Sequence, residues 1–458
     1  MRCIGLTVAS VVLAGCVNFS ALPEPGELTN PALPDIPVNW QTDTSGTGPA
    51  PVGWIDELGD GTLVALVEEA QENNRTLQSV LASVEQSRAI LRQARSSLFP
   101  AINYSASGSE AGLVDGPSAE SYASGLSLNW ELDLWGRVRA SRNAAAFAAQ
   151  ATEADYRFAQ YSLAAGVARA YFGVIEASLQ LAVAQKSLDA LSRTAKIVST
   201  QREFGAADAY DESLALANVA SARASLAQAE GGLRLAKRAL SVLLGRYPDE
   251  LLSIRDDFPI RPAIPTAGLP GELLERRPDI IAAELTVLSA FSDVGATKAT
   301  RLPTFSLSGG LNVSSPEFSD VLDVSNGTWS LATALLGPLF DAGLRRAQID
   351  AASAVQTQAI ALYAQTALEA FEEVENSLDQ NRVIEVRVAA LTDAAAAQNK
   401  AFDLAEFRYQ EGETNLLDVL VVQSNTLTAD SALVSVQREQ LDEWINLNLA
   451  LGGTWQVP

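Results

Sequence analysis

Residues 400–453 read KAFDLAEFRYQEGETNLLDVLVVQSNTLTADSALVSVQREQLDEWINLNLALGG, and they close a proline-free tract that begins at Phe340. Alanine, leucine, glutamine, glutamate and arginine dominate the tract, and these residues are strong helix formers. The one obvious break is Gly412, because glycine adopts the positive φ that ends a helix. The tract therefore predicts two helices joined at Gly412. The first would hold about 60 residues and, at about 1.5 Å per residue, extend about 90 Å.

Large apolar residues recur every seven positions on the second predicted helix. This spacing is that of a coiled-coil seam, which packs against another helix. A spectrin-like or other helical scaffold would show the same seam, so the spacing alone does not identify a function. The residues are Leu420, Leu427, Val434 and Leu441.

The order of predicted elements occurs twice along the chain. Each unit contains a helix, a pair of strands and a long helical hairpin, which indicates an internal duplication. Glycines at matching places recur at one fixed offset. Gly136 and Gly343, Gly205 and Gly412, and Gly245 and Gly452 are each 207 residues apart.

Four segments alternate apolar and polar side chains with the period of a strand that has one apolar face. Their length of roughly ten residues suits strands of an outer-membrane barrel. Four strands cannot close a barrel, and open edges are not tolerated in lipid, so several chains must share one barrel. Two chains are conceivable, and three would give twelve strands; a soluble sheet capping a helical body is the alternative. The segments are Ile102–Gly108, Tyr122–Leu132, Phe305–Val313 and Trp329–Phe340.

The N-terminus has the features of a secretory signal. Arg2 precedes an apolar run from Ile4 to Leu13, which is too short to remain as a spanning helix. Leu-Ala-Gly-Cys then resembles the lipobox of bacterial lipoproteins, in which the cysteine becomes the first residue and is acylated, for example with palmitate. The resemblance predicts lipidation at Cys16; an unmodified thiol is the alternative. Val17 stands where an aspartate would retain such a lipoprotein at the inner membrane, so the outer membrane is favoured.

These features predict an order of domains. The many prolines of residues 16–55 suit an extended tether, and those between 248 and 270 mark a connector. We expect a signal peptide at 1–15, a lipid-anchored tether at 16–55, a first repeat at 56–247, an equatorial connector at 248–270, a second repeat at 271–453 and a C-terminal tail at 454–458.

An ordered set of short motifs resembles the TolC/OprM class of outer-membrane efflux proteins, and the resemblance covers nearly the whole chain after Cys16. It implies a mainly α protein with a small membrane β part, in which long helical hairpins form an α-barrel. A homotrimer would share a twelve-stranded β-barrel. Besides the lipobox, the motifs are Leu134–Arg137, Arg276–Ile280, Phe340–Gly343, Arg408–Gly412, Leu417–Leu420 and Leu451–Gly453.

The resemblance also implies partners and a location. The barrel would lie in the outer membrane and the helices would extend into the periplasm. A periplasmic adaptor and an inner-membrane pump of the RND type would deliver drugs or other small toxic compounds to this passive multidrug efflux channel. Two alternatives stay open: an outer-membrane channel for type I protein secretion, and a coiled-coil envelope lipoprotein without a pore.

Gate residues follow from the same resemblance. Asp418, beside Leu417, matches an aspartate that rings the narrowest point of the pore, and Val421 stands where the family often has a second acid. Tyr409 and Asp211 match a tyrosine and an aspartate whose hydrogen bond holds the pore closed. In the alternative interpretation, the two aspartates are helix-start carboxylates favoured by the helix dipole.

The turns of the two hairpins are candidates for adaptor docking. The family often has small or apolar residues at these tips. The acidic second tip departs from that pattern and would select a basic adaptor tip. The candidates are Phe204, Gly205 and Ala206 in the first turn and Glu411, Gly412 and Glu413 in the second.

The composition excludes other classes of function. The net charge of −23 and the pI near 4.4 argue against nucleic-acid binding, and an acidic lumen would disfavour anionic cargo. The chain has no histidine, the commonest general base and metal ligand. Since no carboxylate cluster or phosphate loop replaces it, an envelope hydrolase lacks a catalytic constellation. We therefore expect neither an enzyme nor a cofactor.

Overall fold

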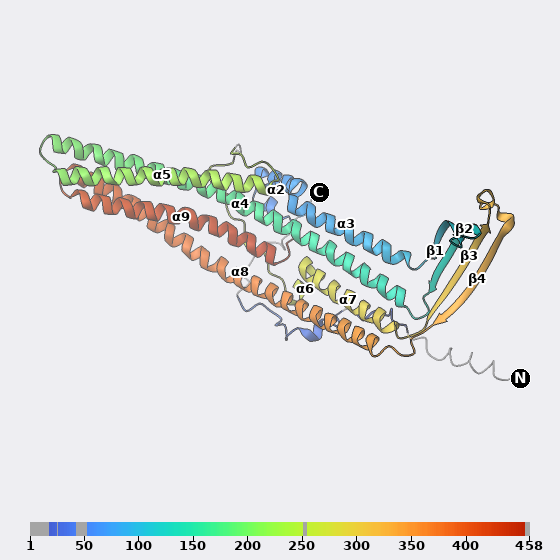
Figure 1. Cartoon of the computed structure of the whole chain (residues 1–458). Helices are drawn as coiled ribbons and strands as arrows, with labels where there is room; N and C mark the ends of the chain where they lie inside the picture. Colours follow the sequence, from blue (N-terminus) through green and yellow to red (C-terminus); the bar gives the residue numbers. More distant parts are fainter. Residues whose placement is uncertain (1–17, 25, 43–52, 251–253, 454–458) are drawn as a thin grey trace. The chain divides into compact units, whose positions relative to one another are not determined.

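The computed structural model describes residues 18–24, 26–42, 53–250 and 254–453 (Figure 1). Cys16, the predicted signal peptide and the predicted C-terminal tail lie outside these residues. The chain divides into two compact units. The first takes its described residues from Met1–Asp35, Ala82–Asp155 and Asp279–Ala367, and the second from Ile36–Leu81, Tyr156–Pro278 and Leu368–Pro458. Each unit therefore combines chain from both halves of the sequence.

The first unit contains a four-stranded antiparallel sheet in the order β1-β2-β3-β4 (Figure 1). The central pair joins the two halves of the chain, with Ser124 of β2 opposite Val313 of β3. The prediction of four strands is confirmed, but the last strand stops before Phe340. It ends at Leu336, two residues before Pro338, because proline has no N–H to donate to a strand ladder. The strands are β1 (Ala101–Gly112), β2 (Ser118–Leu132), β3 (Thr304–Ser315) and β4 (Gly327–Leu336).

The edges of this sheet are β1 and β4. Within the described residues, each of them pairs with a neighbouring strand on one side only. Trp329, Leu331 and Leu335 alternate along β4 and are 79%, 67% and 61% exposed. This uncovered apolar surface indicates contact with lipid or with another chain.

Two long helical hairpins follow the two strand pairs, as predicted. In the first hairpin, α4 (Arg137–Glu203) has 67 residues and α5 (Ala209–Leu243) has 35. In the second, α8 (Leu344–Gln410) has 67 and α9 (Leu416–Ala450) has 35. The two hairpins therefore have identical helix lengths, although their sequences differ.

Shorter helices precede each strand pair. Asn74 separates α2 from α3, because its side chain accepts a hydrogen bond from the Leu77 N–H at 3.0 Å and caps the second helix. Arg277 separates α6 from α7, because Pro278 forces the preceding residue into an extended conformation. The remaining elements are α1 (Trp54–Glu57), α2 (Gly61–Asn73), α3 (Arg75–Ser96), α6 (Leu273–Arg276), α7 (Pro278–Ala299) and the 3₁₀ turns η1 (Asn30–Ala32), η2 (Pro270–Glu272), η3 (Phe318–Asp320) and η4 (Val324–Asn326).

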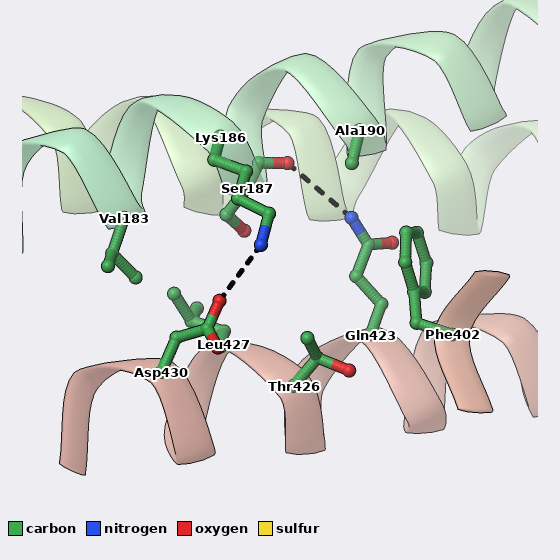
Figure 2. Close-up of a pocket in the computed structure, with 9 residues that line it drawn as sticks. All are labelled: Val183, Lys186, Ser187, Ala190, Phe402, Gln423, Thr426, Leu427 and Asp430. Atoms are coloured by element: carbon green, nitrogen blue, oxygen red, sulfur yellow. Dashed lines mark hydrogen bonds and ion pairs between the residues drawn. The ribbon is translucent and has the colours of Figure 1, made fainter. Parts of the chain in front are cut away.

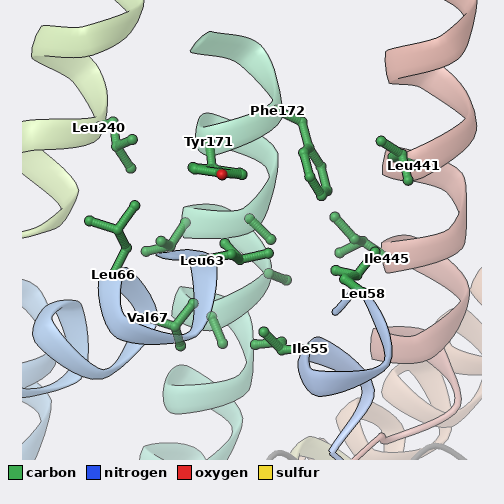
Figure 3. Close-up of a cluster of buried hydrophobic side chains, with 14 of the residues drawn as sticks. Ile55, Leu58, Leu63, Leu66, Val67, Tyr171, Phe172, Leu240, Leu441 and Ile445 are labelled. Carbon is green, nitrogen blue, oxygen red and sulfur yellow. The ribbon is translucent and has the colours of Figure 1, made fainter. Parts of the chain in front are cut away.

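The main core of the second unit lies where α1 and α2 pack against the long helices (Figure 3). Trp54 and Trp444 meet edge to face, with their ring centroids 5.8 Å apart. Tyr171 and Phe172 of α4 are fully buried beside them. These aromatic side chains bury large apolar areas, which makes this cluster a main source of stability.

Asp60 is a polar residue inside this core. Its carboxylate caps α2 by accepting hydrogen bonds from the N–H groups of Thr62 and Leu63, at 3.0 and 3.3 Å. The same carboxylate accepts a hydrogen bond from the Tyr171 hydroxyl at 2.8 Å. It also lies 3.5 Å from a guanidinium nitrogen of Arg255. One buried side chain thus joins α2, α4 and the connector.

The described part of the predicted tether is packed against the second unit at Trp40. The indole is 8% exposed, and it donates a hydrogen bond to the Gly268 carbonyl oxygen at 3.0 Å. The next two backbone N–H groups donate to the carboxylate of Glu375 at 2.7 and 3.0 Å. The chain at this point is held by specific contacts.

Among the described helices, three are long and apolar enough to cross a membrane by length and composition alone: α4, α7 and α9. In α4 and α9, however, charged side chains pair with one another, as Lys186 does with Asp430 and Glu176 with Arg438. Such pairs are typical of helices that pack together in water.

We predict that Asp60→Ala destabilises the second unit by about 2 to 4 kcal/mol, because it removes a helix cap and leaves the Tyr171 hydroxyl without its acceptor. The midpoint of thermal unfolding, followed by circular dichroism, measures this loss. Asp56→Ala is the matched control, since Asp56 lies in the same segment and is exposed. Equal midpoints for the two variants would contradict the structural role of Asp60.

Candidate functional site

The two hairpin turns have the same backbone geometry. Gly205 and Gly412 have φ values of 76° and 77°, which only glycine adopts without strain. In each turn, the next N–H donates to a carbonyl oxygen five residues back: Ala206 to Gln201 at 2.7 Å and Glu413 to Arg408 at 2.8 Å. This is the Schellman motif. The residues predicted for adaptor docking are all exposed in it: Phe204, Gly205, Ala206, Glu411, Gly412 and Glu413.

A buried apolar cluster lies beneath the turns and joins all four long helices. We call it the tip cluster. Tyr409 belongs to it and is 7% exposed. Because the cluster takes side chains from both hairpins, it holds the two turns together. Its buried members are Ala190, Val198, Ala215, Phe402, Tyr409, Leu416, Val419 and Leu420.

The Tyr409 hydroxyl donates a hydrogen bond to the side-chain oxygen of Gln201 at 2.8 Å. The predicted bond from Tyr409 to Asp211 is not among the hydrogen bonds of the described chain, and its role in closing the pore stays a prediction. Burial raises the pKa of Tyr409, and the nearby charge of Asp211 raises it further. Asp211 therefore acts on Tyr409 through its charge, while Gln201 accepts the hydrogen bond from the hydroxyl.

Gln201 is a site residue that the sequence interpretation missed. It belongs to α4, whereas Tyr409 belongs to α8, so this bond connects the first hairpin to the second. The available signal was its position three residues after the buried Val198, on the same helix face. A polar residue on an apolar face often has a buried hydrogen-bond partner.

Leu417, Asp418 and Val421 lie together on the exposed side of α9. The side chains of Leu417 and Val421 are 57% and 51% exposed. Asp418 lies in the first turn of α9, where the helix dipole also favours a carboxylate. The structure thus brings the three predicted gate residues to one open surface, and their role in a gate stays a prediction.

Thr414 lies between the second turn and α9, and it orients Asp418. Its hydroxyl donates a hydrogen bond to the Asp418 carboxylate at 2.8 Å. Asn415 caps the helix by accepting a hydrogen bond from the Asp418 N–H at 2.9 Å. The two contacts fix the position of Asp418 at the start of α9.

A polar network ties α4, α8 and α9 together next to the tip cluster, whose Ala190 and Phe402 line the same small cavity. Lys186 lies 3.1 Å from the carboxylate of Asp430, and Asn399 donates a hydrogen bond to the same carboxylate at 2.6 Å. Figure 2 shows Lys186 and Asp430 facing each other, with Gln423 reaching the Ser187 carbonyl oxygen at 3.4 Å. The cavity beside them is about 30 Å³, far smaller than a cargo-binding pocket. The network joins helices of the two hairpins.

A second polar network joins α4 and α9 at Asp442. A guanidinium nitrogen of Arg438 lies 2.8 Å from one Asp442 oxygen, and another lies 3.1 Å from Glu176. The other Asp442 oxygen is buried without a hydrogen-bond partner in the described chain. Burial raises the pKa of Asp442 to about 6, while Arg438 and Arg169 oppose the rise and Glu176 adds to it.

In the described residues, no group of three or more histidine, cysteine, aspartate or glutamate side chains is placed to hold a metal ion.

We predict that Tyr409→Phe loosens the contact between the two hairpin turns. The ring remains in the tip cluster, but Gln201 loses its donor, which costs about 0.5 to 1.5 kcal/mol. Amide hydrogen exchange at the hairpin turns should become faster. Tyr210→Phe is the control because Tyr210 is 69% exposed; equal exchange in both variants would show that the hydroxyl contributes nothing.

We predict that Asp442 makes stability depend on pH. Because its folded pKa of about 6 exceeds that of an ordinary aspartate, the folded protein binds a proton that the unfolded chain releases. This stabilisation is fully present below about pH 4 and is lost as the pH rises through the folded pKa.

Asp442→Asn should therefore be more stable than the wild type at pH 8, by roughly 2 kcal/mol, and nearly equal to it at pH 4. Thermal unfolding at both pH values measures the difference. Asp393→Asn, at an exposed position of α8, controls for the change in net charge. A difference that does not vary with pH would contradict the assignment to Asp442.

Comparisons with known proteins agree on one family. The family model described as "Outer membrane efflux protein" matches residues 66–246 and 269–453. Outer membrane protein OprJ of Pseudomonas aeruginosa is 33% identical over 419 residues, which cover 88% of this chain and 86% of that protein. Cation efflux system protein CusC of Escherichia coli O6:H1 is 28% identical over 460 residues, covering 99% and 98%.

A solved structure gives the same result. The open state of the MtrE outer membrane channel of Neisseria gonorrhoeae matches with a TM-score of 0.81 and 30% sequence identity, covering 92% of this chain and 96% of that one. Sequence and fold therefore point the same way over nearly the full length. This chain belongs to the outer membrane efflux protein family.

Proposed function

We propose that this protein is the outer-membrane channel of a tripartite efflux system. It passively conducts drugs or other small toxic compounds that an inner-membrane pump of the RND type and a periplasmic adaptor deliver. The observation that carries the proposal is the combination, in one chain of this family, of a sheet with two open edges and two long hairpins with exposed tips.

The open edges support a homotrimer. Backbone N–H and C=O groups at the edges of β1 and β4 need partners in lipid, and further copies of the same strands supply them. Three copies of the four-stranded sheet would close a twelve-stranded barrel. The exposed Trp329, Leu331 and Leu335 then face the membrane. The predicted acyl group on Cys16 is the second attachment to the outer membrane.

The hairpins supply the periplasmic part of the conduit. Since each chain has two hairpins, a trimer would contribute twelve long helices to an α-barrel. The domain order expected from the sequence, two repeats flanking an equatorial connector at 248–270, is part of the proposal. We propose that the protein is not an enzyme and needs no cofactor, because the chain has no histidine, the commonest general base and metal ligand.

The open surface of α9 is the proposed gate. In a trimer, three copies of Asp418 would face one another, flanked by Leu417 and Val421. Negative charges at a narrow point attract cations and repel anions. Val421 is apolar, so the ring has a single acidic layer. Tyr409, with Gln201 and Asp211 beside it, would keep the neighbouring turns in the closed arrangement.

The exposed turns are the proposed docking points for the adaptor. Phe204 is 82% exposed at the first turn, and such an isolated aromatic side chain favours a protein contact. The second turn presents Glu411 and Glu413 to solvent. An adaptor with both an apolar and a basic surface would complement the pair of turns.

Relatives in this family carry different cargo according to their names. CusC is named for cation efflux, and TtgC of Pseudomonas putida for toluene efflux. A passive conduit of this kind needs no cargo-specific pocket. We therefore propose that selection of the cargo rests mainly with the pump.

Single-channel conductance in a planar bilayer tests the proposed function. We predict small, cation-selective currents for the wild type and larger currents for Tyr409→Phe combined with Asp211→Ala, because both groups that restrain the turns are weakened. If neither form conducts current although the protein is folded and oligomeric, the channel function is contradicted and a scaffold role is favoured. If the wild type is already fully open and the mutations do not change its conductance, the channel function is supported and the proposed gate is contradicted.

We also predict that Asp418→Asn lowers the permeability ratio of cations over anions several-fold, because the ring loses its charge. The reversal potential in a salt gradient measures this ratio. Glu413→Gln, which removes an exposed carboxylate at the turn, is the matched control and should leave the ratio closer to that of the wild type. Equal effects of both substitutions would indicate that cation selectivity arises from the general negative charge of the tips and not from Asp418.

A further inference from the structure

Residues Asn18–Ser20 lie in a narrow site on the first unit, directly after the predicted lipidation signal. The backbone N–H of Phe19 donates a hydrogen bond to the Trp135 carbonyl oxygen at 3.1 Å, just after β2 ends. The Ser20 carbonyl oxygen accepts a longer hydrogen bond, 3.5 Å, from the side chain of Asn143 in α4. The peptide is therefore held by one main-chain hydrogen bond and by the side chain of Asn143.

Two glycines make room for this peptide. A Cβ atom on Gly295, near the C-terminal end of α7, would lie 2.4 Å from the Phe19 carbonyl oxygen. A Cβ atom on Gly136, at the β2–α4 turn, would lie 2.7 Å from the side-chain oxygen of Asn18. Real Cβ atoms do not approach oxygen so closely, so any larger residue at either position would displace the peptide.

Gly295 is the more informative of the two. Gly136 has a φ of 79°, so its turn favours glycine for a second reason. Gly295 lies inside a regular helix, where glycine is less favourable than alanine by roughly 0.8 to 1 kcal/mol. The close approach of Phe19 is the feature of the structure that explains a glycine at this position.

We propose that Gly136 and Gly295 form a docking slot for the protein's own N-terminal peptide, and that this slot fixes the lipid anchor beside the membrane sheet. The role in anchoring rests on the proposed acylation of Cys16, whereas the docking of the peptide in the slot does not depend on it. Cys16 lies two positions before Asn18, and two residues of chain reach at most about 7 Å. An acyl group there would enter the membrane next to the β2–α4 turn.

The slot also connects the anchor to the second strand pair. The Trp135 carbonyl oxygen receives the peptide, and the indole of the same residue donates a hydrogen bond to the Pro303 carbonyl oxygen at 2.7 Å, just before β3 begins. Asp133 fixes the same turn by accepting hydrogen bonds from the N–H groups of Val138 and Arg139, at 3.0 and 2.9 Å. The peptide therefore binds where β2, α4, α7 and the start of β3 meet.

Amide hydrogen exchange on the full-length acylated protein, read by mass spectrometry for residues 18–24, tests the slot. In Gly295→Ala, we expect exchange at least about tenfold faster than in the wild type, which corresponds to about 1.4 kcal/mol. Gly173→Ala in α4 is the matched control, because no heavy atom lies within 4 Å of its added Cβ. Wild-type exchange in Gly295→Ala would overturn the slot.

A second variant keeps the test valid if Gly295→Ala folds poorly. Asn18→Ala removes the acceptor of the hydrogen bonds from the Ser20 N–H and hydroxyl, at 3.1 and 2.6 Å, and leaves α7 untouched. It should also speed exchange of residues 18–24 while the rest of the protein exchanges normally. Unchanged exchange in this variant would again count against the slot.

The link to the anchor has its own test. A four-residue Gly-Ser linker inserted between Val17 and Asn18 leaves the slot intact but frees the acyl group from it. We expect the fraction of heat-modifiable oligomer in the outer membrane to fall at least about threefold, as in Gly295→Ala but not in Gly173→Ala. Wild-type assembly with the linker would overturn the role in anchoring. Conductance of the assembled protein is a separate readout, so failure of the slot and failure of the channel are distinguishable.

Discussion

The need of every backbone polar group for a partner in lipid is the constraint on which the rest of this structure depends. The sheet supplies that partner for β2 and β3 on both sides, but for β1 and β4 on one side only. A single chain therefore cannot place this sheet in a membrane. The duplicated architecture follows from the same need, because each strand pair must be joined to others in a closed ring while its hairpin extends into water.

The helical part solves a different problem, since long helices in water must be held together without becoming a solid core. The hairpins do so at separate levels. The tip cluster around Tyr409, the network at Lys186 and Asp430, and the network at Asp442 each join helices of the two hairpins. Polar networks specify which helices pair, whereas the aromatic core around Trp54 and Tyr171 buries large apolar side chains.

Much of the fold could be predicted from the sequence, because its signals are local. Gly412 marks a helix end by its own backbone preference, and strand alternation is visible in Leu126 to Leu132 without any knowledge of neighbours. The breaks at Asn74 and Arg277 were not predicted, although capping and proline chemistry explain them afterwards. The end of β4 at Leu336 was missed because the apolar pattern continues into a segment that Pro338 removes from the sheet.

The candidate site was only partly predictable. Exposure of Asp418 and its neighbours follows from helix periodicity, so their shared surface could be expected. The partner of Tyr409 could not, because Gln201 lies 208 positions away and no local pattern reports which of two nearby acceptors a hydroxyl selects. The docking of Asn18–Ser20 was equally hidden, since it depends on atoms that Gly136 and Gly295 lack.

The equal helix lengths of the two hairpins have an evolutionary consequence. One residue inserted into a single arm would advance its turn by about 1.5 Å and rotate it by about 100°, so the two turns would no longer present matching surfaces to a shared partner. Length variation is thereby confined to the loops between strands, where the two halves of this chain already differ. On this reasoning, the strand loops can change in length, whereas the long helical arms change by substitution.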